Sequence, residues 1–115
     1  MATPPEEFSI SVAEVDGRAQ MTLRGELDLA TAPELEQLLT ERIDASQEVV
    51  VDLRGLEFMD SSGIRVLVAA HARAGRTGTR VLVVRPEADS AVAKIVQVAG
   101  LDRELNILDA PPQAA

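Results

Sequence analysis

Two aspartates and two adjacent serines are the residues of this chain whose types and positions are best suited to chemistry. Asp28 ends a Gly-Glu-Leu-Asp tetrapeptide, and Asp60, Ser61 and Ser62 begin an Asp-Ser-Ser-Gly tetrapeptide. A serine at the start of a helix normally caps free backbone N–H groups, but only one of two adjacent serines can be that cap. We therefore expect the other hydroxyl to be exposed and accessible to a kinase, beside carboxylates that would act on the charge of a phosphate.

Two predicted strands carry these residues to one edge of a sheet. The Val-Val-Val-Asp-Leu run at 49–53 is typical of a strand that is buried on both faces, and the residues after it lead into a helix. An earlier strand ends shortly before Asp28. A helix joins the two strands, which implies that they are parallel, with a right-handed crossover. Because functional residues collect at the carboxyl ends of parallel strands, we expect Asp28, Asp60 and the two serines to lie on one surface.

The first part of the chain predicts a hairpin. Apolar residues alternate with smaller or polar ones from residue 8 to 13 and again from 19 to 24. Asp16-Gly17 lies between the two runs, and this dipeptide favours a two-residue turn in which both residues have positive φ. These two strands should pair antiparallel.

Three helices are expected where apolar residues recur at helical spacing. Thr31 and Glu34 have the spacing of a capping box at the start of the first helix. The predicted boundaries are about 32–45 for the first helix, about 62–74 for the second, which Gly75 ends, a third helix closed by Gly100, and further strands at 80–84 and 106–108. The expected fold class is α/β, a mixed sheet of four or five strands with the first antiparallel and the rest mainly parallel, and about three helices.

Composition narrows the classes of function. The chain has 115 residues, 46% of them hydrophobic, which suits a single domain with one core. Aromatic residues make up only 2% and the formal net charge is −8, so we expect no direct binding to nucleic acid or to a membrane surface. There is no cysteine, no secretory signal at the start and no apolar run long enough to span a bilayer. We expect a cytoplasmic protein.

Several chemistries are disfavoured by what the chain lacks. The only histidine, His71, lies about 15 Å along the same helix from Ser61, so the two cannot form a hydrolase pair. No phosphate-binding loop of the Gly-Lys-Ser/Thr type is present. Asp28 and Asp60 could bind Mg²⁺ weakly, as in phosphate-receiver domains, but receivers have strictly alternating strands and helices and no opening hairpin. We expect no enzyme activity, no cofactor and no metal.

Three segments together resemble a known family. The Gly-Glu-Leu-Asp turn at 25–28, the strand at 49–53 and the Phe-Met-Asp-Ser-Ser-Gly segment at 58–63 resemble the STAS domain. They are most similar to its small stand-alone members, the bacterial anti-sigma factor antagonists. The resemblance runs from about Phe8 to Leu108. It implies flexible tails at 1–6 and 110–115 around a STAS domain at 7–109.

The resemblance implies a partner switch. Ser61 matches the serine that an anti-sigma factor with a histidine-kinase-like ATPase domain, itself a serine kinase, phosphorylates in this family. The unphosphorylated antagonist binds the anti-sigma factor and frees the sigma factor, phosphorylation abolishes binding, and a serine phosphatase restores it. Asp28 and Asp60 match aspartates near the acceptor. We add Ser62, Gly63, Arg65 and Arg73 to the expected partner surface, with Arg65 one helical turn beyond Ser61.

One alternative function stays open. The chain could be a soluble STAS accessory module, in a lipid-transport or stress-signalling complex, that has no phosphorylation switch. Its oligomeric state is expected to be a monomer or a weak dimer.

Overall fold

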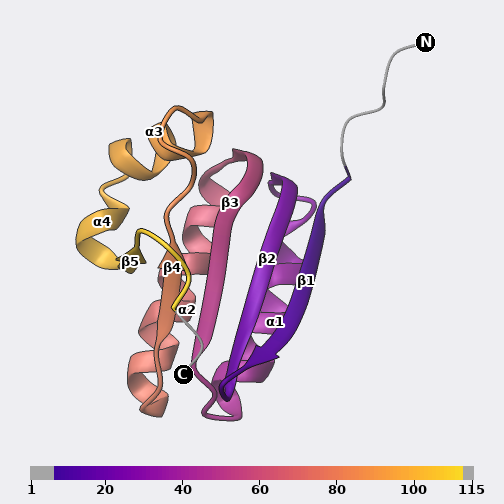
Figure 1. The fold of residues 1–115 in the computed structure, drawn as a ribbon, viewed down its shortest axis with the longest axis vertical. Coiled ribbons are helices and arrows are strands. Elements are labelled where there is room, and N and C mark those ends of the chain that lie inside the picture. Colours follow the sequence, from indigo (N-terminus) through magenta and orange to yellow (C-terminus); the bar gives the residue numbers. More distant parts are fainter. Residues whose placement is uncertain (1–6, 113–115) are drawn as a thin grey trace.

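One sheet of five strands organises residues 7–112, the part of the chain that the computed structural model describes (Figure 1). The expected tail at 1–6, and residues 113–115 of the expected tail at 110–115, lie outside the described residues. In chain order the elements are β1 (Ser9–Val15), β2 (Arg18–Leu27), α1 (Ala32–Asp44), β3 (Val49–Met59), α2 (Ser61–Thr77), β4 (Val81–Val84), α3 (Ala91–Val98), α4 (Leu101–Glu104) and β5 (Asn106–Leu108).

The strands lie in the order β1-β2-β3-β4-β5. β1 and β2 pair antiparallel, and the turn between them has positive φ at both residues, 52° at Asp16 and 80° at Gly17. The hairpin predicted from Asp16-Gly17 is therefore confirmed. β2, β3, β4 and β5 pair in parallel, so the predicted mixed α/β sheet is confirmed as well.

The core lies on one face of this sheet. α1 and α2 lie side by side behind the sheet in Figure 1, and their apolar sides pack against alternate residues of the strands. Leu35, Leu39 and Ile43 of α1 recur at helical spacing and are almost completely buried. On the other face, Val50, Leu82 and Val84 form a smaller buried cluster with Leu108 packed against it. The helix-covered face thus holds most of the apolar side chains, and the packing of these side chains positions α1 and α2 on the sheet.

β3 is longer than the sequence pattern predicts. The expected strand ended at residue 53, whereas β3 continues to Met59 and pairs with β2 up to Leu27. The register shifts twice along this pair, so that Leu53, Leu56 and Met59, three residues apart, are all buried on the helix side. The shifts are β-bulges, which insert an extra residue and reverse the alternation of side chains. The predicted end of β3 was wrong because its second half does not alternate.

The helix ends also differ from the predicted ones. Gly75 lies inside α2, which continues to Thr77 and ends at Gly78 with a φ of 79°. The prediction that Gly75 ends the helix is therefore wrong, since the left-handed cap conformation occurs three residues later. A fourth helix that was not predicted, the single turn α4, follows Gly100, whose φ is 70°.

Candidate functional site

The carboxyl ends of β2 and β3 bring the two aspartates side by side. Leu27 pairs with Met59 in the register of the sheet, and the backbone N–H of Asp60 donates to the carbonyl of Leu27 at 3.1 Å. Asp28 and Asp60 are therefore the next residues along two adjacent parallel strands, which lie about 4.8 Å apart. Ser61 follows as the first residue of α2. The topology thus gathers three of the expected site residues at one edge.

Asp28 builds the loop between β2 and α1. Its Oδ1 accepts hydrogen bonds from the backbone N–H groups of Ala30 at 3.0 Å and Thr31 at 3.2 Å. The Thr31 hydroxyl donates to the carbonyl of Glu26 at 2.9 Å and accepts from the N–H of Asp28 at 2.9 Å. The expected capping box between Thr31 and Glu34 is wrong, because the Thr31 side chain makes no cap hydrogen bond to the helix and points back to the strand end instead.

Asp60, rather than either serine, caps α2. Its backbone is extended, and its Oδ1 accepts from the N–H of Ser62 at 2.8 Å. The expectation that a serine is the cap is therefore wrong. Ser61 is exposed, and its hydroxyl has no hydrogen-bond partner anywhere in residues 7–112, whereas Ser62 is half-buried. Of the two serines, Ser61 is the more exposed to another protein.

Gly63 fixes the position of the first turn of α2. A Cβ at this position would lie 2.7 Å from Cδ2 of Leu27 and 2.8 Å from Cγ of Met59. Real Cβ atoms do not approach that closely, so only glycine lets the helix rest directly on the ends of β2 and β3. This close packing holds Ser61 at the sheet edge.

Two apolar side chains at this edge were missed by the sequence reasoning. Leu29 is 78% exposed beside Asp28, and Phe58 is 39% exposed two residues before Asp60. Leu29 carried a usable signal, since it follows the strand in a loop where no periodic pattern needs a leucine. Phe58 carried none, because the bulges in β3 decide the direction in which it points.

The two expected arginines occupy different parts of α2. Arg65 is exposed one turn beyond Ser61 and makes no ion pair with any residue from 7 to 112. Arg73 lies about 18 Å along the helix from Ser61. It donates two hydrogen bonds of 2.7 Å to Asp44 at the end of α1, and these hydrogen bonds hold the pKa of the Asp44 carboxyl below its ordinary value. The structure therefore does not bring Arg73 together with the serine.

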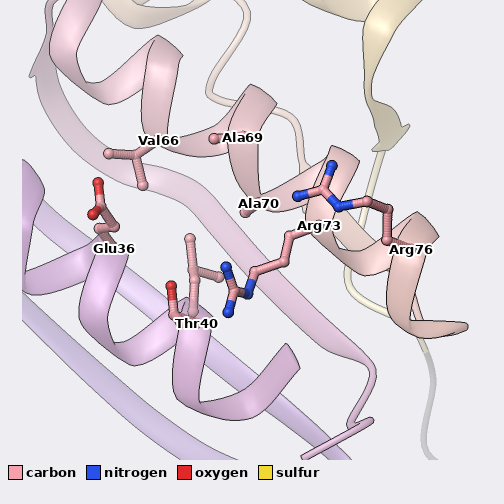
Figure 2. Close-up of a pocket in the computed structure, with 8 residues that line it drawn as sticks. Glu36, Thr40, Val66, Ala69, Ala70, Arg73 and Arg76 are labelled. Atoms are coloured by element: carbon pink, nitrogen blue, oxygen red, sulfur yellow. The ribbon is translucent and has the colours of Figure 1, made fainter. Parts of the chain in front are cut away.

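Arg73 lines a groove between α1 and α2 (Figure 2). The groove has a volume of about 200 Å³, and its walls carry Glu36, Leu39 and Thr40 from α1 and Val66, Ala69, Ala70, Arg73 and Arg76 from α2. Ser61 is not among these residues. The groove is thus separate from the serine edge, the part of the surface at the carboxyl ends of β2 and β3 that carries Asp28, Asp60 and Ser61.

Residues 7–112 hold neither a metal-binding cluster nor a helix that could span a membrane. No group of three or more His, Cys, Asp or Glu side chains there is arranged to hold a metal ion. Within the same residues, every helix is too short or too polar to cross a membrane.

Comparisons with known proteins agree with this arrangement. A family model described as "Mlab, STAS domain" matches residues 10–109. The anti-sigma-F factor antagonist RsfB of Mycobacterium tuberculosis is 30% identical over 104 residues, which cover 90% of this chain and 83% of RsfB.

Two solved structures share the fold. An anti-sigma factor antagonist from Mycobacterium paratuberculosis superposes with a TM-score of 0.80 at 27% identity, covering 95% of this chain and 92% of that one. The anti-sigma factor antagonist SpoIIAA, in its unphosphorylated form, superposes with a TM-score of 0.75 at 22% identity, covering 90% and 89% of the two chains. At that identity the likeness to SpoIIAA concerns the fold alone.

Proposed function

Because this chain belongs to the STAS domain family, with a relative among its anti-sigma factor antagonists, we propose that it is an antagonist that works by switching partners at Ser61. The unphosphorylated chain binds and sequesters an anti-sigma factor that is also a serine kinase, and a sigma factor is released for transcription. Phosphorylation of Ser61 abolishes this binding, and a serine phosphatase reverses it. In this role the chain is a cytoplasmic regulator, without a catalytic centre or cofactor of its own.

One observation carries the proposal: the Ser61 hydroxyl is exposed and unpartnered within residues 7–112, at the first position of α2. Asp60 takes over the capping of the helix, so the serine is not needed to satisfy the backbone. A residue that is exposed, next to a fixed strand end and without a structural hydrogen bond is well placed for a kinase. Asp28 and Asp60 form its acidic surroundings, and Ser62, Gly63 and Arg65 follow it on the helix.

The fold should tolerate a phosphate at this position. A helix N-terminus stabilises a nearby anion by about 0.3–1 kcal/mol. Neighbouring carboxylates oppose it, since two unit charges about 7 Å apart at an effective dielectric constant of about 20 repel by about 2.4 kcal/mol before salt screening. Before screening the repulsion is the larger of the two effects, and salt and the exposure of Ser61 reduce it, so we expect the phosphate to destabilise the domain without unfolding it. The larger effect falls on the partner, whose docked surface would have to accommodate both the volume and a charge of about −1.5 to −2.

Release of the anti-sigma factor therefore needs only a local structural change around Ser61. Gly63 packs without a Cβ against Leu27 and Met59, so the first turn of α2 has little freedom to move. We expect the phosphorylated and unphosphorylated domains to share one backbone outside residues 58–65. A pair of structures tests this expectation, and a rearrangement that spreads through the whole sheet would contradict it.

Phosphorylation in vitro tests the proposal as a whole. Each kinase-type anti-sigma factor encoded by the source bacterium is purified and incubated with the chain and ATP, and intact-protein mass spectrometry counts the phosphates. We expect one anti-sigma factor to bind the chain and to add one phosphate, which Ser61→Ala abolishes and Ser62→Ala keeps. Stable binding that is unchanged by Ser61→Asp would indicate an accessory module without a switch. No binding by any of these proteins would contradict the proposal.

A further inference from the structure

Helix α3 is apolar on both sides, although only one side faces the core. Val92 and Val96 point inward and are 0% and 2% exposed. On the outer side Ile95 is only partly buried, and Val98 is 82% exposed, the most exposed of the large hydrophobic side chains in residues 7–112. Lys94 and Gln97 are the only polar residues of α3, so its apolar surface extends beyond the side that faces the core, and an exposed apolar surface of this kind is normally covered. The outer side of α3 therefore has the character of a surface that is covered in the working state.

This outer side forms the wall of a hollow beside the serine edge. The hollow has a volume of about 450 Å³ and is lined by Ile64, Ala91, Lys94, Ile95, Val98 and Ala99. Lys94 is the only charged residue among them. Ile64 belongs to α2 and lies three residues, about one helical turn, after Ser61. A protein that covers Ser61 is thus close enough to cover the hollow in the same encounter.

We propose that the hollow receives an apolar side chain of the anti-sigma factor and anchors it independently of the phosphorylated residue. This inference rests on the proposed function, because that function supplies the partner. The side chain that fits is an aliphatic or aromatic one flanked by positive groups. The apolar lining calls for the first property. Asp28 and Asp60 at the neighbouring serine edge, which have no ion pair within residues 7–112, call for the second, whereas Lys94 in the lining calls for a neutral or acidic group on its own side.

A second copy of the chain fits this surface less well. A twofold interface places the same patch of both copies together. Centred on the hollow, it would bring Lys94 of one copy near Lys94 of the other, because Lys94 lines the hollow, and their charges would repel. A different protein that faces Lys94 with a neutral or acidic group avoids this repulsion. An apolar side chain in a desolvated pocket is also the kind of contact that dominates binding at protein interfaces.

The test compares two charge substitutions on neighbouring residues of α3. Val98→Asp places a carboxylate in the hollow, whereas Gln97→Asp adds the same charge on the other side of α3, where Gln97 lies near Ala93. The probe is the purified anti-sigma factor that binds the wild-type chain in the phosphorylation experiment. We expect Val98→Asp to weaken its binding at least tenfold and Gln97→Asp to change it less than twofold, with thermal unfolding confirming that both variants are folded.

A second variant covers the case in which Val98→Asp fails to fold. Val98→Thr keeps the shape of the side chain and adds only a hydroxyl, so it should fold and weaken binding about threefold or more. If both Val98 variants bind as tightly as wild type while Ser61→Asp loses binding, the hollow is not an anchor, although the proposed function stands. If no anti-sigma factor binds the wild-type chain, both proposals fail. If the wild-type chain dimerises and Val98→Asp makes it monomeric, a second copy covers the hollow and this proposal is wrong.

Discussion

The two edges of the sheet, at the amino and carboxyl ends of its parallel strands, are held by different kinds of contact. At the amino-terminal edge, charged side chains join segments that are far apart in the sequence. At the carboxyl-terminal edge, where Ser61 lies, the side-chain hydrogen bonds of Asp28 and Asp60 stay within their own loops. The difference indicates that the amino-terminal edge stabilises the fold, while the part of the carboxyl-terminal edge around Ser61, at the ends of β2 and β3, is left open for recognition.

Glu48 is the centre of the amino-terminal edge. It lies just before β3 and pairs at 2.5 Å with Arg18 at the start of β2 and at 2.5 Å with Arg80 just before β4. The starts of three adjacent strands are thereby linked through one carboxylate. Arg42 near the end of α1 also pairs with Glu14 of β1, and this contact extends the linkage to the edge strand.

The carboxyl ends of β2 and β3 lack such links within residues 7–112, whereas Arg85, just after β4, pairs with Asp102 and with Asp109, just after β5. Glu26, Asp28, Glu57 and Asp60 lie at the ends of β2 and β3 and make no ion pair with any residue in that range. Two exposed apolar side chains, Leu29 and Phe58, lie among them. Unpaired charges beside exposed apolar groups contribute little to folding and are typical of a surface that meets a partner.

The largest expected effect is on binding and comes from the open edge. We expect Ser61→Asp to weaken binding to the anti-sigma factor more than a hundredfold, because a loss of about 3 kcal/mol suffices for that factor. Its free energy of unfolding should stay within about 0.5 kcal/mol of wild type, as for surface substitutions in general. Calorimetric titration and urea unfolding measure the two quantities. A strong destabilisation of the domain by Ser61→Asp would contradict the inference that the surface around Ser61 contributes little to folding.

The next effect concerns the packing that positions Ser61. Gly63→Ala should lower the free energy of unfolding by about 1–2 kcal/mol, since overpacking costs about 1–3 kcal/mol and the better helix propensity of alanine returns up to about 1 kcal/mol. Gly75→Ala in the same helix is the control, because a Cβ there meets nothing within 4 Å. It should raise stability by about 0.5–1 kcal/mol. Equal effects of the two substitutions in urea unfolding would show that Gly63 is not constrained by Leu27 and Met59.

A smaller effect on the free energy of unfolding distinguishes Asp60, which caps α2, from Ser61, the proposed phosphate acceptor. Asp60→Ala should lower the free energy of unfolding by about 1 kcal/mol, because it removes the hydrogen bond to the N–H of Ser62. Ser61→Ala should change it by less than about 0.5 kcal/mol. Chemical unfolding of the two variants side by side makes the comparison. A larger loss of unfolding free energy for Ser61→Ala than for Asp60→Ala would indicate that Ser61, not Asp60, caps the helix.

The smallest effect is the pH dependence of the stability that the ion pairs of Glu48 give to the amino-terminal edge. Burial raises the pKa of Glu48, but the hydrogen bonds from Arg80 and Arg18 lower it by more, so that it stays below its ordinary value of 4.5. A lowered pKa in the folded state means that the stabilisation is full at pH values above 4.5 and is lost as the pH falls through the folded-state pKa. Glu48→Gln should therefore cost about 0.5–1 kcal/mol at neutral pH.

Urea unfolding from neutral to strongly acidic pH tests this dependence. The difference between wild type and Glu48→Gln should shrink toward zero on acidification, because Glu48 becomes neutral in wild type as well. A difference that stays constant with pH would mean that the charge of Glu48 contributes nothing to the amino-terminal edge.

Much of the fold could be predicted because its signals are local. Asp16-Gly17 defines a turn within two residues, and strict alternation identifies the strands of the hairpin. The second half of β3 was not predictable in this way. Its two bulges exist only in register with β2, and at one of them Gly55 lies so close to the chain that a Cβ would be 2.8 Å from the carbonyl of Leu23. Such contacts between distant segments leave no periodic pattern.

The residues at the site were predictable only in part. Their meeting at one edge follows from strand order, so Asp28, Asp60 and Ser61 could be placed together from the sequence. Their hydrogen bonds could not, because Ser, Thr and Asp side chains compete for the same backbone N–H groups. The direction in which the chain leaves β3 decides that Asp60 is the cap, and the direction in which it leaves β2 turns Thr31 toward Glu26.

The sequence by itself determined the order and type of the elements other than α4, and the acidic, serine-bearing turn between β3 and α2, because propensity, alternation and turn chemistry act over a few residues. Only the tertiary structure decided that Ser61 is more exposed than Ser62, that Arg73 pairs with Asp44, and that Val98 lies uncovered in the same hollow as Ile64. The physical reason is that exposure and pairing depend on what packs against a side chain from elsewhere in the chain. Those neighbours are set by the sheet register and by the close approach of helix to strand, and neither can be read from a single segment.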